Sequence, residues 1–158
     1  MLSSRCQAKE GKMGQPVQIK FIDNDHIETD DWINGHPCIK VGVFYTPKPA
    51  LGIDYSTTPA WALIDTGADH VYIEQEYLDN HQAPMGRPVH TNREMDASHI
   101  HRACVMVDQT GEVFDFQTVI GRRLTSSGQP FRVVLGRSFL SIFRFDFDPR
   151  EKRALLHR

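Results

Sequence analysis

Long apolar runs are missing from this 158-residue sequence. A helix that spans a bilayer needs roughly 20 consecutive apolar residues, and no stretch approaches that length. The opening residues, MLSSRCQAKEGKMGQPV, also lack the apolar segment of a secretory signal peptide. We therefore expect no membrane partner and a cytoplasmic location.

Paired cysteines are missing as well. Cys6, Cys38 and Cys104 are scattered and form no Cys-x-x-Cys motif, which argues against a disulfide framework and a zinc site and fits a reducing compartment. His99 and His101 would share one face of a strand. No cysteine or carboxylate stands at a recognisable ligand spacing beside them. We predict no metal and no other cofactor.

An excess of charge of one sign is also absent. Eighteen Lys and Arg residues stand against 20 Asp and Glu residues, for a net charge of −2. This balance gives no electrostatic reason to expect nucleic acid as a partner. The chain is 40% apolar and 24% charged, which is ordinary for a globular protein. Its length suits one domain with its own core.

Helical periodicity is nearly absent. Apolar residues come in short runs rich in Val, Ile and Phe, separated by Gly, Pro, Asn and Asp, which is typical of β-strands. The predicted strands are 17–22, 38–45, 60–64, 71–74, 100–107, 113–120, 131–135, 143–147 and a short last one at 153–157. One short helix is predicted over 136–143. The spacing favours an all-β barrel or sandwich.

Three segments break the strand pattern. Residues 1–16 are polar and predict a flexible N-terminal lead, which leaves 17–158 as the domain. Residues 46–59 carry three prolines and a glycine and predict a long loop, most simply of an elongated hairpin. Residues 79–99 are polar and mostly non-periodic. A stretch of that length inside a compact domain is more often functional than idle.

A carboxylate follows directly on one apolar strand, in the sequence ALIDTGAD over 62–69. Asp65, Thr66 and Gly67 can form a plain turn, since Asp bonds its own backbone and Gly accepts unusual conformations. A second segment, VVLGRSFL over 133–140, lies about 70 residues downstream and also runs from apolar residues through a glycine into a helix. The pair is more specific than either motif alone.

With these two motifs the chain resembles the retropepsin-like, single-domain aspartic proteases. The resemblance covers roughly residues 36–150 and includes the order of the strands between the motifs. It implies a closed β-barrel with one short C-terminal helix. Proteases of this family use two aspartates that share a proton and hold a water between them. This sequence has a single Asp-Thr-Gly, so the resemblance implies a C2 homodimer in which each subunit supplies its Asp65.

The resemblance also assigns roles around the catalytic Asp65. Thr66 holds the partner loop across the two-fold axis, and Gly67 offers its carbonyl to the substrate. Asp69 contacts the substrate backbone, next to Ala68, and pairs with Arg137. For the last two residues the alternative is a pair of solvated surface charges.

A flap that covers the substrate should fall within 89–100, VHTNREMDASHI. This stretch contains no glycine, unlike many family flaps, and its alternative is an ordinary surface loop. Met95 near the expected tip and His99 beside it are the predicted substrate contacts.

Two functions follow. The first is an aspartic endopeptidase, a hydrolase that cleaves extended peptide or protein substrates. The alternative is a non-catalytic module of the same fold that binds a peptide or holds a dimer together. The intact Asp-Thr-Gly favours the enzyme, since a scaffold has little need for an acid there.

Overall fold

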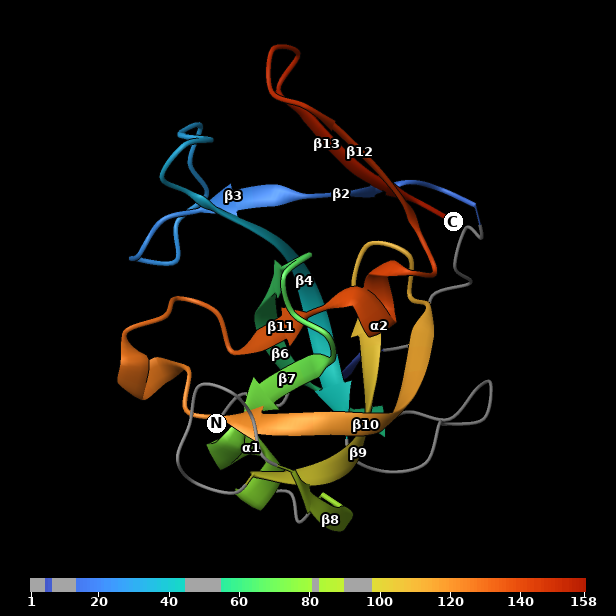
Figure 1. Ribbon diagram of the computed structural model, residues 1–158. Helices are drawn as coiled ribbons and strands as arrows, with labels where there is room; N and C mark the ends of the chain where they lie inside the picture. The colour runs from blue at the N-terminus through green and yellow to red at the C-terminus, as the bar shows by residue number, and fades with distance from the viewer. Residues whose placement is uncertain (1–4, 7–13, 45–54, 81–82, 90–97) are drawn as a thin grey trace.

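The computed structural model describes residues 5–6, 14–44, 55–80, 83–89 and 98–158 (Figure 1). Strands dominate the described chain. Their bounds are β1 Arg5–Cys6, β2 Val17–Gln18, β3 Lys20–Ile22, β4 His36–Phe44, β5 Tyr55–Ser56, β6 Thr58–Ile64, β7 Val71–Glu74, β8 Met85–Val89, β9 Ser98–Val107, β10 Val113–Arg122, β11 Val133–Leu135, β12 Arg144–Asp148 and β13 Arg153–His157. The short helices are α1 Gln75–Asn80, the 3-10 helix η1 Thr125–Ser127 and α2 Arg137–Leu140. Within the described residues, no helix is long and apolar enough to cross a lipid bilayer.

The main sheet closes into a barrel. Its strands follow the order β3-β4-β6-β11-β7-β10-β9-β8, and β9 also pairs with β4. The ring therefore runs through β4, β6, β11, β7, β10 and β9, which confirms the predicted all-β closed barrel. Closure leaves no open edge within that ring, and β3 and β8 extend it on either side.

Alternation along the strands builds two apolar clusters on opposite faces of the barrel wall. Inward residues such as Ala62 and Ile64 on β6 belong to the main core. Their neighbours Trp61 and Leu63 pack instead with an outer cluster around Phe131. Successive side chains of a strand point to opposite faces, so one apolar run can supply both clusters. This explains why the strand sequences are almost continuously apolar.

Two smaller sheets lie outside the barrel. The strands β12, β13 and β2 form a three-stranded antiparallel sheet, and β1 pairs with β5. In Figure 1 the β12–β13 hairpin projects from one end of the barrel, and α1 and β8 lie at the other end. The pair β1–β5 involves two residues of the range predicted as a flexible lead, so the division at residue 16 stays a prediction.

The arms on either side of the 46–59 loop pair as expected for a hairpin. Val43 on β4 stands opposite Thr58 on β6 in an antiparallel register. Most of the loop, residues 45–54, lies outside the described residues.

Some elements differ from the prediction. The single predicted helix over 136–143 is shorter, and α1 and η1 are additional. The strand predicted over 17–22 is divided into β2 and β3, and β8 lies within the stretch predicted to be irregular. Helix α1 has six residues and a single buried one, Leu78, and so short a segment cannot display a helical period.

Candidate active site

Asp65 stands at the rim of the barrel, just past the end of β6. Its backbone N–H donates to the carbonyl of Leu135 at 3.2 Å, which extends the parallel pairing of β6 with β11 by one residue. Val133, Val134 and Leu135 are all buried. The strand that precedes Asp65 is therefore held between β4 and β11 in the wall of the barrel.

A tight turn presents the Asp65 carboxylate. The N–H of Ala68 donates to the Asp65 carbonyl at 3.2 Å. The N–H of Gly67 donates to Oδ1 of the Asp65 side chain at 2.8 Å, a hydrogen bond that stabilises a carboxylate. Asp65 is half-buried, and Thr66 and Gly67 are exposed at the tip. Among the described residues, no basic side chain forms an ion pair with Asp65.

The second predicted motif fixes the rest of this loop. Gly136 donates its N–H to the carbonyl of His70 at 3.1 Å, and Arg137 donates to the carbonyl of Ala68 at 2.8 Å. Ser138 donates to the carbonyl of Asp69 at 3.0 Å. The first N–H groups of a helix have no partner inside the helix. Here the loop after Asp65 supplies those partners, so α2 and the loop are locked together.

Gly136 makes this close approach possible. A β-carbon at that position would lie 2.3 Å from the His70 carbonyl oxygen and 2.6 Å from that of Ala68. Both distances are far below van der Waals contact with backbone atoms that cannot move aside. The requirement for glycine therefore comes from space between two backbones, which only the structure reveals.

Packing within an aromatic cluster holds α2 in place. Phe139 is fully buried, and its ring lies 5.4 Å from that of Phe114 and 4.9 Å from that of Phe143. Aromatic pairs at these separations add to the free energy gained by burial. The sequence placed Phe139 and Phe143 within the predicted helix over 136–143 but did not identify them as the support of the Asp65 loop.

Asp69 and Arg137 form an ion pair across the junction of the loop and α2. Both side chains are more than 60% exposed. An exposed pair of this kind contributes little to stability, usually less than about 1 kcal/mol. Its substrate role therefore stays a prediction, and its structural effect is to tie the exposed side of the loop to α2.

The predicted flap is described only in its arms. Strands β8 and β9 pair antiparallel, with Val89 opposite Ser98 and Pro88 opposite His99. Residues 90–97, which include Met95, lie outside the described residues. His99 is half-buried on β9. The structure thus brings Asp65, Ala68, Asp69 and Arg137 together in one loop cluster, with His99 on a separate hairpin.

His101 lies two residues further along β9 and is buried, with 5% of its surface exposed. Burial lowers the pKa of its imidazole, and the nearby Ala83 carbonyl and the Asp79 carboxylate raise it less. Nδ1 of His101 has no hydrogen-bond partner among the described residues. Within the described part of the chain, no group of three or more His, Cys, Asp or Glu is arranged to hold a metal ion.

Comparison of the sequence with models of known protein families finds no match, and comparison with curated proteins finds none. Solved structures do match. One of them is a retropepsin-like aspartic protease from Rickettsia conorii, with a TM-score of 0.52 and 16% sequence identity over 90% of this chain and 92% of that chain. At this identity the similarity establishes the fold alone. The protein therefore has a retropepsin-like fold.

Proposed function

We propose that this protein is an aspartic endopeptidase that works as a C2 homodimer. The observation that carries the proposal is the position of Asp65. Its carboxylate is half-buried on a tight turn at the end of a core strand, and α2 locks the following residues through three backbone hydrogen bonds. A plain surface turn does not need such support, whereas a catalytic acid must be held in a fixed geometry.

The chemistry requires a second carboxylate. Two adjacent carboxyl groups cannot both ionise, so the pair holds a single shared proton. The ionised carboxylate takes a proton from a bound water, and the water oxygen bonds to the scissile carbonyl carbon. The protonated carboxyl group gives its proton to the carbonyl oxygen. The tetrahedral intermediate then collapses, the carbon–nitrogen bond breaks and the departing nitrogen receives a proton.

The chain supplies one Asp-Thr-Gly, so the second Asp65 comes from another copy. A two-fold axis beside the turn would place the two carboxylates together and the two exposed Thr66 side chains next to each other. Because Thr66 and Gly67 are exposed in the single chain, they are available for that contact. A separate monomer lacks the pair of carboxylates and is expected to be inactive.

The substrate is proposed to be an extended peptide bound as a strand. Ala68, Asp69 and Arg137 would contact its backbone from the floor of the site, and the Asp69–Arg137 ion pair fixes two of them in place. The β8–β9 hairpin would cover it, with His99 and Met95 as contacts. Strand-like binding satisfies the peptide backbone and leaves alternate side chains to set specificity.

The test is peptide cleavage by the purified dimer, measured with a mixed peptide library from pH 4 to 7. Asp65→Asn is expected to lower the cleavage rate by about three orders of magnitude or more, since it removes the shared-proton pair. The variant should keep its thermal stability within a few degrees. Pepstatin should inhibit the wild type.

Asp25→Asn is the matched control, because Asp25 is exposed in the 23–27 turn. Its activity should equal that of the wild type. Cleavage that persists in Asp65→Asn would overturn the proposal. A stable dimer that cleaves nothing would point to the non-catalytic module instead.

A further inference from the structure

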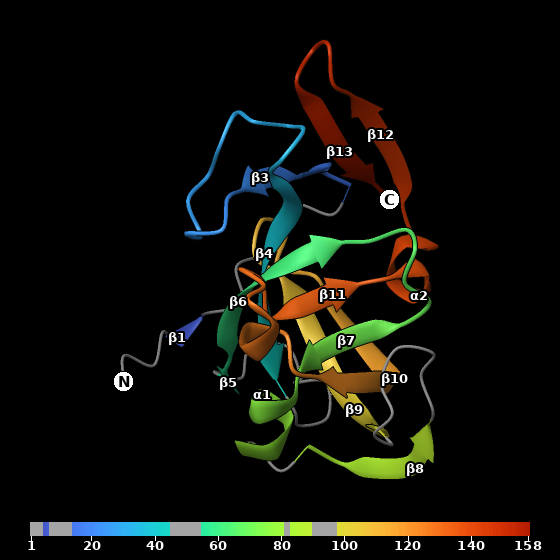
Figure 2. The ribbon, with the colours of Figure 1, turned by 60° about the vertical axis from the view of Figure 1, so that its left-hand side comes forward.

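Side chains on the outer face of the barrel wall form rows that run across the strands. Leu63 on β6 stands opposite Val134 on β11. Val134 in turn stands opposite Tyr72 on β7, and Tyr72 stands opposite Ile120 on β10. Figure 2 shows β11, β7 and β10 side by side in this order. These four residues are called the apolar row, and the first three of them belong to the outer apolar cluster.

The apolar row lies one step from Asp65. Asp65 follows Leu63 by two residues, and alternate residues of a strand point to the same face. Asp65 still belongs to the pairing of β6 with β11, because its N–H donates to the carbonyl of Leu135. The row and Asp65 are therefore on one face, about 6.7 Å apart along the strands. A peptide whose reacting bond reaches Asp65 would lie against this row.

A second row, one step further from Asp65, carries charges. The N–H of Arg132 donates to the carbonyl of Trp61 at 3.1 Å, and the N–H of Glu74 donates to the carbonyl of Arg132 at 2.9 Å. Arg122 stands opposite Glu74 in the pairing of β10 with β7. From β6 to β10, this charged row consists of Trp61, Arg132, Glu74 and Arg122. The cation at its β10 end leans toward the apolar row.

Arg122 reaches over a ring of the apolar row. Its Cζ atom lies 4.5 Å from the centre of the Tyr72 ring, within the range of a cation–π contact. Arg122 is half-buried, and its Nε is buried without a hydrogen-bond partner among the described residues. The ring thus holds the guanidinium on one side but satisfies none of its N–H donors. Donors of this kind match the two oxygens of a carboxylate.

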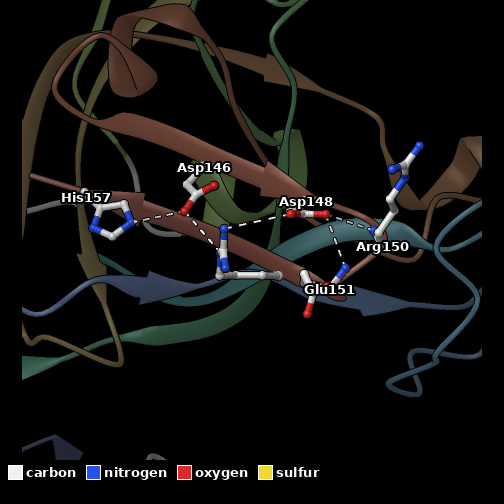
Figure 3. Close-up of polar contacts among 6 residues, drawn as sticks. Asp146, Asp148, Arg150, Glu151 and His157 are labelled. Atoms are coloured by element: carbon white, nitrogen blue, oxygen red, sulfur yellow. Dashed lines mark hydrogen bonds and ion pairs between the residues drawn. The ribbon is translucent and has the colours of Figure 1, made fainter.

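Arg122 differs from arginines that already have carboxylate partners. On the β12–β13 hairpin, Nε of Arg153 lies 3.2 Å from Asp146, and one of its terminal nitrogens lies 4.0 Å from Asp148; Figure 3 labels both carboxylates. For Arg122, no carboxylate of the described chain lies within ion-pair distance. A partly desolvated cation without a counter-ion is costly for the folded chain. An incoming carboxylate would remove that cost.

The carboxylate opposite Arg122 in register is used elsewhere. Glu74 is buried, and its Oε2 accepts the N–H groups of Leu124 at 3.0 Å and of Thr125 at 2.8 Å. These two hydrogen bonds hold the chain just after β10 at the start of η1. Glu74 therefore fixes the end of the strand that carries Arg122. The guanidinium is left free to bind a group from outside the chain.

We propose that Arg122 is a specificity-determining residue that binds an acidic side chain of the substrate. This inference rests on the proposed function and deepens it. The substrate would be an extended peptide with apolar residues at the cleaved bond, against the apolar row, and a glutamate or aspartate a few positions away, against Arg122. Each subunit of the proposed homodimer supplies one Arg122, so the preference should hold on both sides of the cleaved bond.

The register sets the distance between the cleaved bond and the acidic residue. Tyr72 lies two strands from β6 in the order β6-β11-β7, or about 9.6 Å, and about 6.7 Å along the strands from Asp65. Together these steps give about 12 Å. An extended peptide covers about 3.3 Å per residue, and a glutamate side chain adds its own length. The acidic residue is therefore expected at roughly the second to fourth residue from the cleaved bond.

Binding of short peptides to the Asp65→Asn protein tests this preference without requiring cleavage. The neutral probe is the peptide Gln-Gln-Gln-Phe-Phe-Gln-Gln-Gln, blocked at both ends, whose central pair suits the apolar row. Each of three acidic probes carries Glu at the second, the third or the fourth residue on both sides of the central bond. One of them should bind about tenfold tighter than the neutral probe, as expected for a charge-assisted hydrogen bond.

Substitutions of Arg122 in the Asp65→Asn protein assign the preference to this side chain. Arg122→Gln should bring the acidic and neutral probes to within about twofold of each other. Arg123→Gln is the matched control, because it removes the same charge from an exposed neighbour, and it should keep the preference. Arg122→Glu should invert the preference, so that a probe with Lys in place of Glu binds tighter than the neutral probe. Thermal unfolding checks that each variant is folded.

Equal binding of the neutral probe and all acidic probes would overturn this inference. So would a preference that survives Arg122→Gln, or one that Arg123→Gln removes equally. Cleavage of the same probes by the wild type is measured separately. A protein that cleaves peptides without preference for Glu keeps the proposed function and loses this inference. A protein that binds the acidic probe through Arg122 but cleaves nothing loses the proposed function and keeps the site for an acidic side chain.

Discussion

At the scale of single residues, the Asp65 turn depends on Gly136 having no β-carbon. The carbonyls of His70 and Ala68 approach Gly136 so closely that a β-carbon there would lie 2.3 and 2.6 Å from their oxygens. The same carbonyls accept hydrogen bonds from Gly136 and Arg137. Filling this space would therefore strain the hydrogen bonds that hold the residues after Asp65.

Gly136→Ala is expected to destabilise the fold by about 1–3 kcal/mol, the usual cost of forcing atoms into a packed site. It should also lower cleavage activity more than its loss of stability explains, because the Asp65 turn must shift. Chemical denaturation and peptide cleavage measure the two effects. Gly86→Ala is the control, since its added carbon would only touch the Ile100 carbonyl at 3.4 Å. Equal stability of both variants would contradict this account of the loop.

His101 gives the folded state a pH dependence. Burial lowers its pKa in the folded protein, from about 6.5 in an unfolded chain. The unfolded state therefore binds a proton more readily. This contribution to stability is fully present above pH 6.5 and is lost as the pH falls through the lowered pKa of the folded state.

The expected result is that His101→Gln loses less stability than the wild type when the pH is lowered from about 7.5 to 5. The free energy of unfolding from urea titrations at several pH values checks this. His26→Asn, at an exposed position in the 23–27 turn, should follow the wild type. Parallel curves for wild type and His101→Gln would show that His101 does not titrate as its burial requires.

The sequence was sufficient to single out the residues of the candidate site whose chemistry is unusual for their position, and their roles stay predictions. Asp65 follows an apolar strand, and Asp69 and Arg137 stand beside the two motifs. It could not predict the close contact at Gly136, because the distance between two backbones is not encoded in the spacing of residues. It also gave no reason to expect that His101 would be buried while His99 is only half-buried.

At the scale of elements, α2 is the support of the site. The helix has four residues, so propensity alone cannot hold it. Phe139 fixes it by packing among Phe114, Phe116 and Phe143. The N-terminal N–H groups of the helix then hold the loop after Asp65. The packing of one ring thus supports the Asp65 turn through backbone hydrogen bonds.

Phe139→Ala should cost about 3–5 kcal/mol, as expected for an aromatic side chain removed from a packed core. Thermal or urea unfolding measures the loss. Ile33→Ala removes an apolar side chain that is 93% exposed, and it should change stability by about 0.5 kcal/mol or less. A loss for Phe139→Ala as small as that of Ile33→Ala would mean that α2 is held by something other than the aromatic cluster.

Elements made of apolar runs were predictable, and elements defined by tertiary contacts were not. The strands that form the barrel carry apolar residues on both faces and were found within a few residues of their bounds. β8, by contrast, is MGRPV, with a glycine and a proline that argue against a strand. It exists because β9 pairs with it. The helix over 136–143 ends at Leu140, where the chain turns toward β12.

At the scale of the whole molecule, the barrel holds the single Asp-Thr-Gly of the sequence at its rim. One chain therefore supplies one carboxylate at that position. In the proposed function, a second copy about a two-fold axis supplies the other. Fold similarity alone does not establish this assembly, so it must be measured.

The most direct measurement mixes wild-type chains with Asp65→Asn chains at constant total concentration, under conditions in which subunits exchange. If each site needs Asp65 from both chains, activity follows the square of the wild-type fraction. An equal mixture then retains about one quarter of the wild-type activity. Retention of about one half, in proportion to the wild-type fraction, would show that one chain is sufficient and would contradict the shared site.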